Sequence, residues 1–82
     1  MVFLKGNFNK EDLLHARVAV DFIKLIKNSG CNVYFITEDK EINCKSMIGI
    51  LKLNIKKGDT IHLKIEGENH LELFLQIEEL LF

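Results

Sequence analysis

The sequence predicts a two-layer α+β sandwich whose elements follow the order βαββαβα. The prediction depends on two patterns. Four short segments have the alternating or β-branched composition of strands, and in three others apolar residues recur at helical spacing. Because each such helix has one apolar face, the helices must together cover one face of a sheet. A chain of 82 residues is long enough for one such domain, spanning residues 1–82.

The first half of the chain supplies a strand, a helix and a second strand. Residues 2–8 alternate as a half-buried strand does, and Gly6 within them is expected to be a weak point or a bulge. From Ala16 onward the apolar residues follow helical spacing, and Gly30 is suited to the left-handed conformation that ends a helix. Residues 32–37 are rich in β-branched and aromatic side chains, which favours the second strand.

The middle of the chain predicts a hairpin and a short helix. Residues 38–40 form a polar turn, and residues 41–44 return as a shorter strand. Ser46 is suited to cap a helix that runs through Leu53, because its hydroxyl can accept a bond from a free N–H of the first turn. Asn54 can then take the left-handed conformation after that helix.

The last part of the chain predicts a turn, a strand and a helix. Residues 56–59 form the turn, and apolar and polar side chains alternate over residues 61–65. Asn69 is the expected N-cap of the last helix, which runs through Leu81. The apolar stripe of this helix is Leu73, Phe74, Ile77, Leu80 and Leu81.

The composition argues against several classes of protein. Hydrophobic residues make up 48% of the chain, which predicts a packed fold, and a net charge of −1 argues against non-specific nucleic-acid binding. No apolar run approaches the roughly 20 residues of a membrane span, and nothing in the sequence indicates a secretory leader. Cys31 and Cys44 are too few for a disulfide scaffold, so buried reduced side chains are expected, with a regulatory disulfide as the alternative. No metal-binding spacing is present.

The segment Leu14-His15-Ala16-Arg17 predicts a site for a phosphoryl group. A helix N-terminus has unpaired N–H groups and a partial positive charge, so it favours an anion. His15 would be the nucleophile, because the helix terminus and Arg17 both disfavour protonation of its ring. Arg17 and the first-turn N–H groups, that of Ala16 included, would then hold the phosphate. Taken alone, these residues also fit a capping histidine beside a solvated arginine.

Four motifs carry a resemblance to a known family. They are Leu14-His15-Ala16-Arg17, Lys45-Ser46-Met47-Ile48-Gly49 with Leu51 and Leu53, Lys56-Lys57-Gly58-Asp59, and Glu66-Gly67-Glu68. Each motif is common by chance, but all of them in this order and at these intervals are specific. Over nearly its whole length the chain resembles HPr, the histidine-containing phosphocarrier family of the bacterial sugar phosphotransferase system.

The resemblance implies a four-stranded antiparallel sheet with three helices on one face. It also implies that His15 takes a phosphoryl group from phosphorylated Enzyme I and passes it to enzyme II A domains in the cytoplasm. Such a chain needs no cofactor of its own and is a phosphocarrier rather than a free-standing catalyst. In Gram-positive members the serine matching Ser46 is phosphorylated by an ATP-dependent kinase/phosphorylase, and the product binds a catabolite-control transcription factor.

The chain departs from the family pattern around the histidine. The family usually has asparagine or serine, glycine and proline where this chain has Asp12, Leu13 and Val18. Leu13 restricts the loop, Val18 lacks the fixed φ of proline, and an inward-pointing Asp12 would repel phosphate. These departures leave a second function open. In that alternative, the chain is a regulatory binding protein that signals through Ser46 phosphorylation, with little or no transfer at His15.

A docking face for partners is expected on the solvent side of the first two helices. It comprises Val20, Lys24, Met47, Ile48 and Leu51. A short helix over a sheet cannot bury all three of its apolar residues here, so Ile48 and Leu51 are expected to point outward. Phosphate on Ser46 would add up to ~−2 charges beside this face and oppose acidic partners. The alternative is that Ser46 only caps the helix.

Two further sets of residues are expected on the surface. His62 and His70 are interpreted as ordinary surface residues. Tyr34 and Ile36 face the side of the sheet that no helix covers. A monomer is expected, and a dimer contact through Tyr34 and Ile36 is the alternative.

Overall fold

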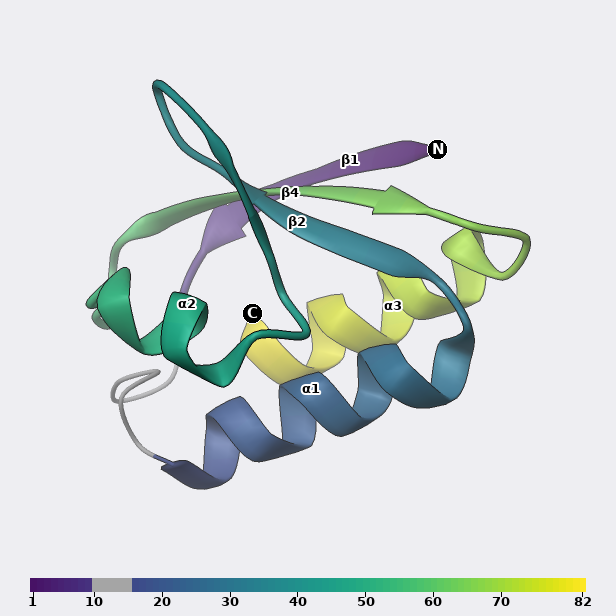
Figure 1. The fold of residues 1–82 in the computed structure, drawn as a ribbon, viewed down its shortest axis with the longest axis horizontal. Helices are drawn as coiled ribbons and strands as arrows, with labels where there is room; N and C mark the ends of the chain where they lie inside the picture. Colours follow the sequence, from purple (N-terminus) through teal and green to yellow (C-terminus); the bar gives the residue numbers. More distant parts are fainter. Residues whose placement is uncertain (10–15) are drawn as a thin grey trace.

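The computed structural model describes residues 1–9 and 16–82, and the elements follow the predicted order. They are β1 (Val2–Asn7), α1 (Ala16–Ser29), β2 (Asn32–Ile36), β3 (Glu41–Asn43), α2 (Met47–Lys52), β4 (Thr60–Glu66) and α3 (His70–Leu81). The sheet has the strand order β1-β4-β2-β3 with antiparallel pairing throughout. The three helices lie on one face of it (Figure 1), which confirms the predicted sandwich.

The core lies between the helices and the inner face of the sheet. The central strand β4 contributes Ile61, Leu63 and Ile65, each at most 3% exposed. Phe22 of α1 packs on Phe35 of β2 with ring centroids 5.8 Å apart. The other buried helix residues are Ala19, Ile23 and Ile26 in α1, Ile50 in α2, and Leu73, Ile77 and Leu81 in α3. These residues lie in the apolar stripes that the sequence predicts.

Three helix ends lie at the residues that the local sequence predicts. Gly30 after α1 has φ +75° and Asn54 after α2 has φ +54°, as the capping rules predict. Asn69 is the N-cap residue of α3, but its side chain makes no capping bond. Its Nδ2 instead donates to the carbonyl oxygen of Ser29 at 3.4 Å. The predicted N-cap residue is therefore confirmed, and its side chain links the start of α3 to the end of α1.

Gly6 does not form the expected bulge. The pairing of β1 with β4 is continuous through Gly6, which lies opposite Ile61. A Cβ at this position would lie 3.1 Å from the ring of Phe82. Glycine is therefore explained by the C-terminal ring, which packs closely on β1.

Both cysteines are buried and unpaired, as the sequence predicts. The backbone N–H of Cys44 donates to the carbonyl oxygen of Val33 at 2.9 Å, which places it opposite a residue two positions from Cys31. The two cysteines thus share a face without being directly opposite. Burial raises the pKa of the Cys44 thiol, so the reactive thiolate is disfavoured.

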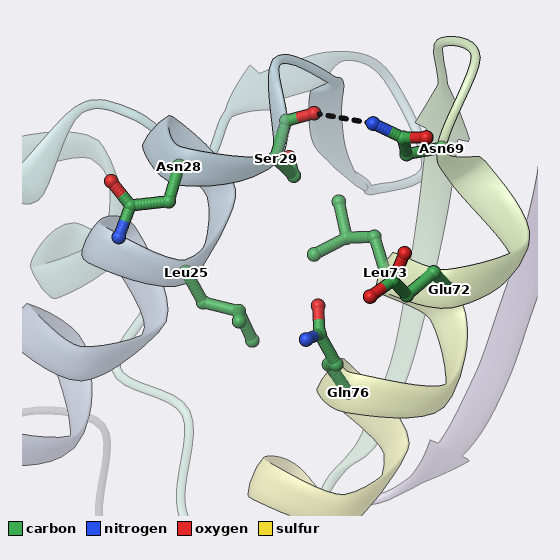
Figure 2. Close-up of a pocket in the computed structure, with 7 residues that line it drawn as sticks. All are labelled: Leu25, Asn28, Ser29, Asn69, Glu72, Leu73 and Gln76. Carbon is green, nitrogen blue, oxygen red and sulfur yellow. Dashed lines mark hydrogen bonds between the residues drawn. The ribbon is translucent and has the colours of Figure 1, made fainter.

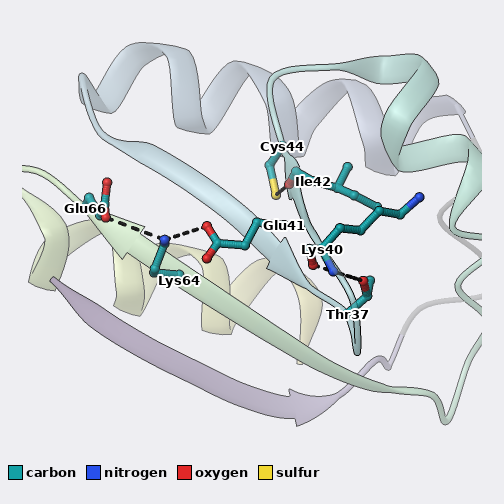
Figure 3. A network of polar contacts seen from close by, with 7 residues as sticks. All are labelled: Thr37, Lys40, Glu41, Ile42, Cys44, Lys64 and Glu66. Atoms are coloured by element: carbon teal, nitrogen blue, oxygen red, sulfur yellow. Dashed lines mark hydrogen bonds and ion pairs between the residues drawn. The ribbon is translucent and has the colours of Figure 1, made fainter.

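An ion pair crosses the outer face of the sheet (Figure 3). The Lys64 ammonium lies 2.5 Å from Glu41 Oε1 and 3.8 Å from Glu66 Oε1. The hydrogen bond to Glu41 raises the pKa of Lys64. The same ammonium lies 5.0 Å from the centroid of the Tyr34 ring. The dimer contact through Tyr34 and Ile36 stays a prediction.

The backbone conformation of Gly67 and its closeness to Cys31 both disfavour any other residue at this position. Its φ is +141°, and a Cβ there would lie 2.7 Å from Cys31 Sγ and 3.0 Å from Cys31 Cα. We expect Gly67→Ala to lower the free energy of unfolding by about 3 kcal/mol, since backbone strain and overpacking add. Urea unfolding followed by circular dichroism measures the change.

Gly30→Ala is the matched control for that substitution. Gly30 also has a positive φ, but no atom lies within 4 Å of a Cβ built there. Only the left-handed penalty of about 1 kcal/mol is expected. Equal losses for the two variants would contradict the close approach of Gly67 to Cys31.

Candidate functional site

The predicted nucleophile, His15, lies outside the described residues, together with Asp12 and Leu13. The structure does describe the helix that follows it. α1 begins at Ala16, the next residue in the chain, as the sequence predicts. The structure therefore describes the helix that follows the predicted nucleophile.

The first turn of α1 has the charge that an anion site needs. It contains no acidic residue, and Arg17 is exposed. The N–H groups at the start of a helix lack partners within the helix, so Ala16 and Arg17 present donors there. A phosphate next to this turn would meet a guanidinium and backbone N–H groups without a competing carboxylate from the turn itself.

Val18 has a structural explanation. It is half-buried and packs against the core cluster. The side chain that replaces the family's usual proline thus points inward rather than toward solvent. The departure at this position changes the packing of α1 as well as the φ restraint of its first turn.

Ser46 caps α2 as predicted. Its backbone is extended, with φ −94° and ψ 109°, and its Oγ accepts a hydrogen bond from the N–H of Gly49 at 3.1 Å. The residue is exposed, so its hydroxyl also faces solvent. Gly49 is a residue that the sequence reasoning missed. A Cβ there would lie 3.0 Å from Ile42 Cγ2, so this glycine lets α2 lie close to β3.

The docking face has the predicted exposure at Ile48 but only in part at Leu51. Ile48 is 67% exposed, whereas Ile50 takes the buried position of α2. Met47 is half-buried and packs against the core, and Leu51 is half-buried. On α1, Val20 is half-buried and Lys24 is exposed. The outward position of Ile48 is confirmed, and the role of this surface in binding stays a prediction.

Lys52 was missed as a neighbour of the docking face. It is exposed and lies four residues after Ile48 on α2. Residues at that spacing are neighbours on a helix surface, so the sequence did contain the signal. Arg17, Lys24 and Lys52 give this side of the molecule several exposed cations.

A polar hollow between α1 and α3 is separate from the candidate site (Figure 2). Its volume is about 280 Å³, and Leu25, Asn28, Glu72 and Gln76 are among the residues that line it. Asn28 follows Arg17 by eleven positions, which corresponds to about 16 Å along a helix. The hollow is thus too far from the start of α1 to hold a group attached there.

The remaining histidines make no site of their own. His62 is exposed, and His70 Nδ1 lies 2.8 Å from the carbonyl oxygen of Gly67. Within residues 1–9 and 16–82, no three side chains of His, Cys, Asp or Glu are placed to hold a metal ion together. No helix in the same residues is long and apolar enough to cross a membrane.

Comparison with known proteins gives one consistent result. The family model described as "PTS HPr component phosphorylation site" matches residues 8–82. The phosphocarrier protein HPr of Buchnera aphidicola subsp. Schizaphis graminum is 38% identical over 56 residues, which are 68% of this chain and 66% of that protein. HPr of Xylella fastidiosa (strain Temecula1) is 28% identical over 67 residues, 82% of this chain and 75% of that one.

Solved structures agree with the sequence matches. HPr-C-His from Thermoanaerobacter tengcongensis has a TM-score of 0.86 and 27% identity, covering 99% of this chain and 91% of that chain. HPr from Bacillus anthracis has a TM-score of 0.87, with 99% and 96% covered. At 23% identity this second likeness shows the fold alone.

The capping bond of Ser46 gives a stability prediction. Ser46→Ala leaves the N–H of Gly49 without its partner, so we expect the free energy of unfolding to fall by about 1 kcal/mol. Ser46→Asp retains an acceptor and should remain close to the wild type. Urea unfolding of the three proteins measures this order. An alanine variant as stable as the wild type would contradict the capping role.

Proposed function

The chain belongs to the HPr family of the bacterial phosphotransferase system, and on that premise we propose that it carries a phosphoryl group on His15. The donor is phosphorylated Enzyme I, the acceptors are enzyme II A domains, and the location is the cytoplasm. The observation that supports the proposal most is the family match across a segment that contains His15, with α1 beginning at the next residue.

The proposed chemistry needs little beyond a nucleophile and fixed donors. A neutral nitrogen of His15 attacks phosphorus, and the bond from phosphorus to the donor breaks as the new N–P bond forms. Charge in such a transfer lies mainly on the phosphoryl oxygens. The exposed Arg17 guanidinium and the first-turn N–H groups would stabilise these oxygens. Because Arg17 is exposed, a group held beside its guanidinium would remain accessible to the next acceptor.

The docking face supplies the contacts with partners in this proposal. Its exposed apolar residue, Ile48, lies one turn before Lys52 on α2, and Lys24 lies on the neighbouring α1. An apolar centre with cations around it fits an acidic partner that has an apolar patch of its own. Enzyme I and the enzyme II A domains would bind this face in turn.

Regulation through Ser46 is the second candidate function. The hydroxyl is exposed and lies at the start of the helix that bears Ile48. A phosphate there would add up to ~−2 charges next to the docking face and weaken its attraction for acidic partners. The departures at Leu13 and Val18 favour this function over efficient transfer. Its partners would be a kinase/phosphorylase and a catabolite-control transcription factor.

Phosphorylation by Enzyme I tests the main proposal. With phosphoenolpyruvate and Enzyme I, we expect an acid-labile mass increase of one phosphoryl group, and His15→Ala should abolish it. His62→Ala removes an exposed histidine of β4, and this variant should be labelled normally. No labelling of the wild type by an Enzyme I that labels another HPr would contradict the proposal. Acid-stable labelling of Ser46 by the kinase, with none at His15, would establish the regulatory alternative.

The docking face gives a kinetic prediction. Ile48→Ala is expected to raise the KM of Enzyme I for this protein by about tenfold with little change in kcat, because it removes an exposed apolar contact. Phe3→Ala is the matched control, since Phe3 is 62% exposed and lies on β1. Similar effects of the two substitutions would contradict a docking role for α2.

A further inference from the structure

The charges of this chain are divided unevenly between its two ends. Residues 66–82 contain five glutamates and no lysine or arginine. All 11 lysines and arginines therefore lie in residues 1–65, where they outnumber the acidic residues. The net charge of −1 is thus the sum of a negative charge on residues 66–82 and a positive charge on residues 1–65. Such a division favours association between unlike surfaces.

The acidic region also has an exposed apolar centre, which the fold does not use. Leu71 and Leu75 lie one turn apart on α3 and are 65% and 63% exposed. Glu72, Glu78 and Glu79 are exposed on the same helix. At about 100° per residue, these five residues lie on the side away from the buried Leu73 and Ile77. We call this surface, comprising Leu71, Glu72, Leu75, Glu78 and Glu79, the α3 outer face.

The docking face is complementary to the α3 outer face in its exposed apolar residues and in the sign of its charge. Its centre is apolar, with Ile48 exposed and Leu51 half-buried. Lys24 is its exposed cation, and Arg17 and Lys52 are further exposed cations of the same two helices, against one exposed carboxylate of α1, Asp21. The α3 outer face has two exposed leucines and three carboxylates, whereas cations outnumber carboxylates on the exposed sides of α1 and α2. Contact between the two would bury both apolar centres and pair their charges.

We propose that the α3 outer face binds the docking face of a second copy of this chain. Contact between two α3 outer faces would instead bring glutamates against glutamates, which charge repulsion disfavours. α3 packs on β1 and β4, whereas α2 packs on β3 at the other edge of the sheet. The two helices therefore lie over opposite edges of the sheet, on the same face of it, with α1 packed against both of them (Figure 1). Contact between the α3 outer face and the docking face is heterologous, and successive copies add head to tail.

The association is expected to be weak and reversible. Two exposed leucines and a few surface charges make a contact smaller than a standard interface, and surface charges are screened by salt. Each contact covers the docking face of one molecule. If the proposed function holds, association therefore competes with phosphotransfer partners; this consequence alone rests on that function.

Sedimentation velocity of the purified, unphosphorylated chain tests the association without Enzyme I. At low ionic strength the average mass should rise with protein concentration, and high salt should reduce it because the paired charges are exposed. A mass that stays monomeric at every concentration would overturn the proposal. It would leave labelling of His15 unaffected, so the two failures are distinguishable.

Variants identify the two surfaces. The double variant Leu71→Ala/Leu75→Ala and the single variant Ile48→Ala should each weaken association by about tenfold or more. The Ile48→Ala variant retains the α3 outer face, and the Leu71→Ala/Leu75→Ala variant retains the docking face. An equimolar mixture of these two variants should therefore form dimers that do not grow further. A mixture that stays monomeric, or an Ile48 variant that associates normally, would overturn the heterologous contact.

Phe3→Ala is the matched control for loss of an exposed apolar side chain. Phe3 is 62% exposed but lies on β1, away from both proposed surfaces. Its removal should leave the concentration dependence unchanged. Loss of association in this variant alone would place the contact at the sheet and overturn the proposal. Circular dichroism spectra would establish that all variants are folded.

Discussion

The burial of one face of β4 is the constraint on which the rest of the structure depends. This strand pairs with β1 on one side and β2 on the other, and it turns Ile61, Leu63 and Ile65 toward the helices. Because side chains alternate along a strand, a slip of one residue would expose all three at once. Their burial therefore fixes the register of both neighbouring strands. It also creates the apolar surface on which α1 and α3 pack.

On α1 and α2, the residues that stabilise the core and the residues proposed to bind partners lie on different sides of the helix. On α1, Phe22 packs against β2 while Arg17 and Lys24 remain in solvent. On α2, Ile50 is buried and Ile48 is exposed. A group carried on the surface needs no enclosing pocket, and the polar hollow between α1 and α3 is indeed remote from the start of α1. Surface substitutions can thus alter partner choice without disturbing the core.

The chain's departures from the family pattern affect either the core or the surroundings of the proposed phosphoryl site. Val18 packs against the core, so its effect includes the seating of α1. Leu13 and Asp12 lie outside the described residues, and their effect on the histidine stays a prediction. The acidic character of α3 concerns neither the core nor the phosphoryl site. It instead gives the molecule a second surface that is opposite in charge to the first.

The sequence by itself determined the features that depend on near neighbours. The element order, the apolar stripes and the conformations of Gly30 and Asn54 follow from patterns a few residues long, and so does the cap at Ser46. The family motifs predict a phosphoryl site at His15, which stays a prediction, and helix spacing correctly predicted the outward position of Ile48. The same helix spacing predicts that Lys52 is a neighbour of Ile48, although Lys52 was not among the residues predicted for the docking face.

Only the tertiary structure decided the features that depend on residues distant in the chain. Gly6 is explained by the ring of Phe82, and Gly67 by the atoms of Cys31. The side chain of Asn69 bonds to the end of α1 and makes no capping bond within its own helix. The placement of α2 and α3 over opposite edges of the sheet likewise depends on the strand order. Local sequence determines which conformations a segment favours, but the partners that meet there are set by how the sheet and helices pack.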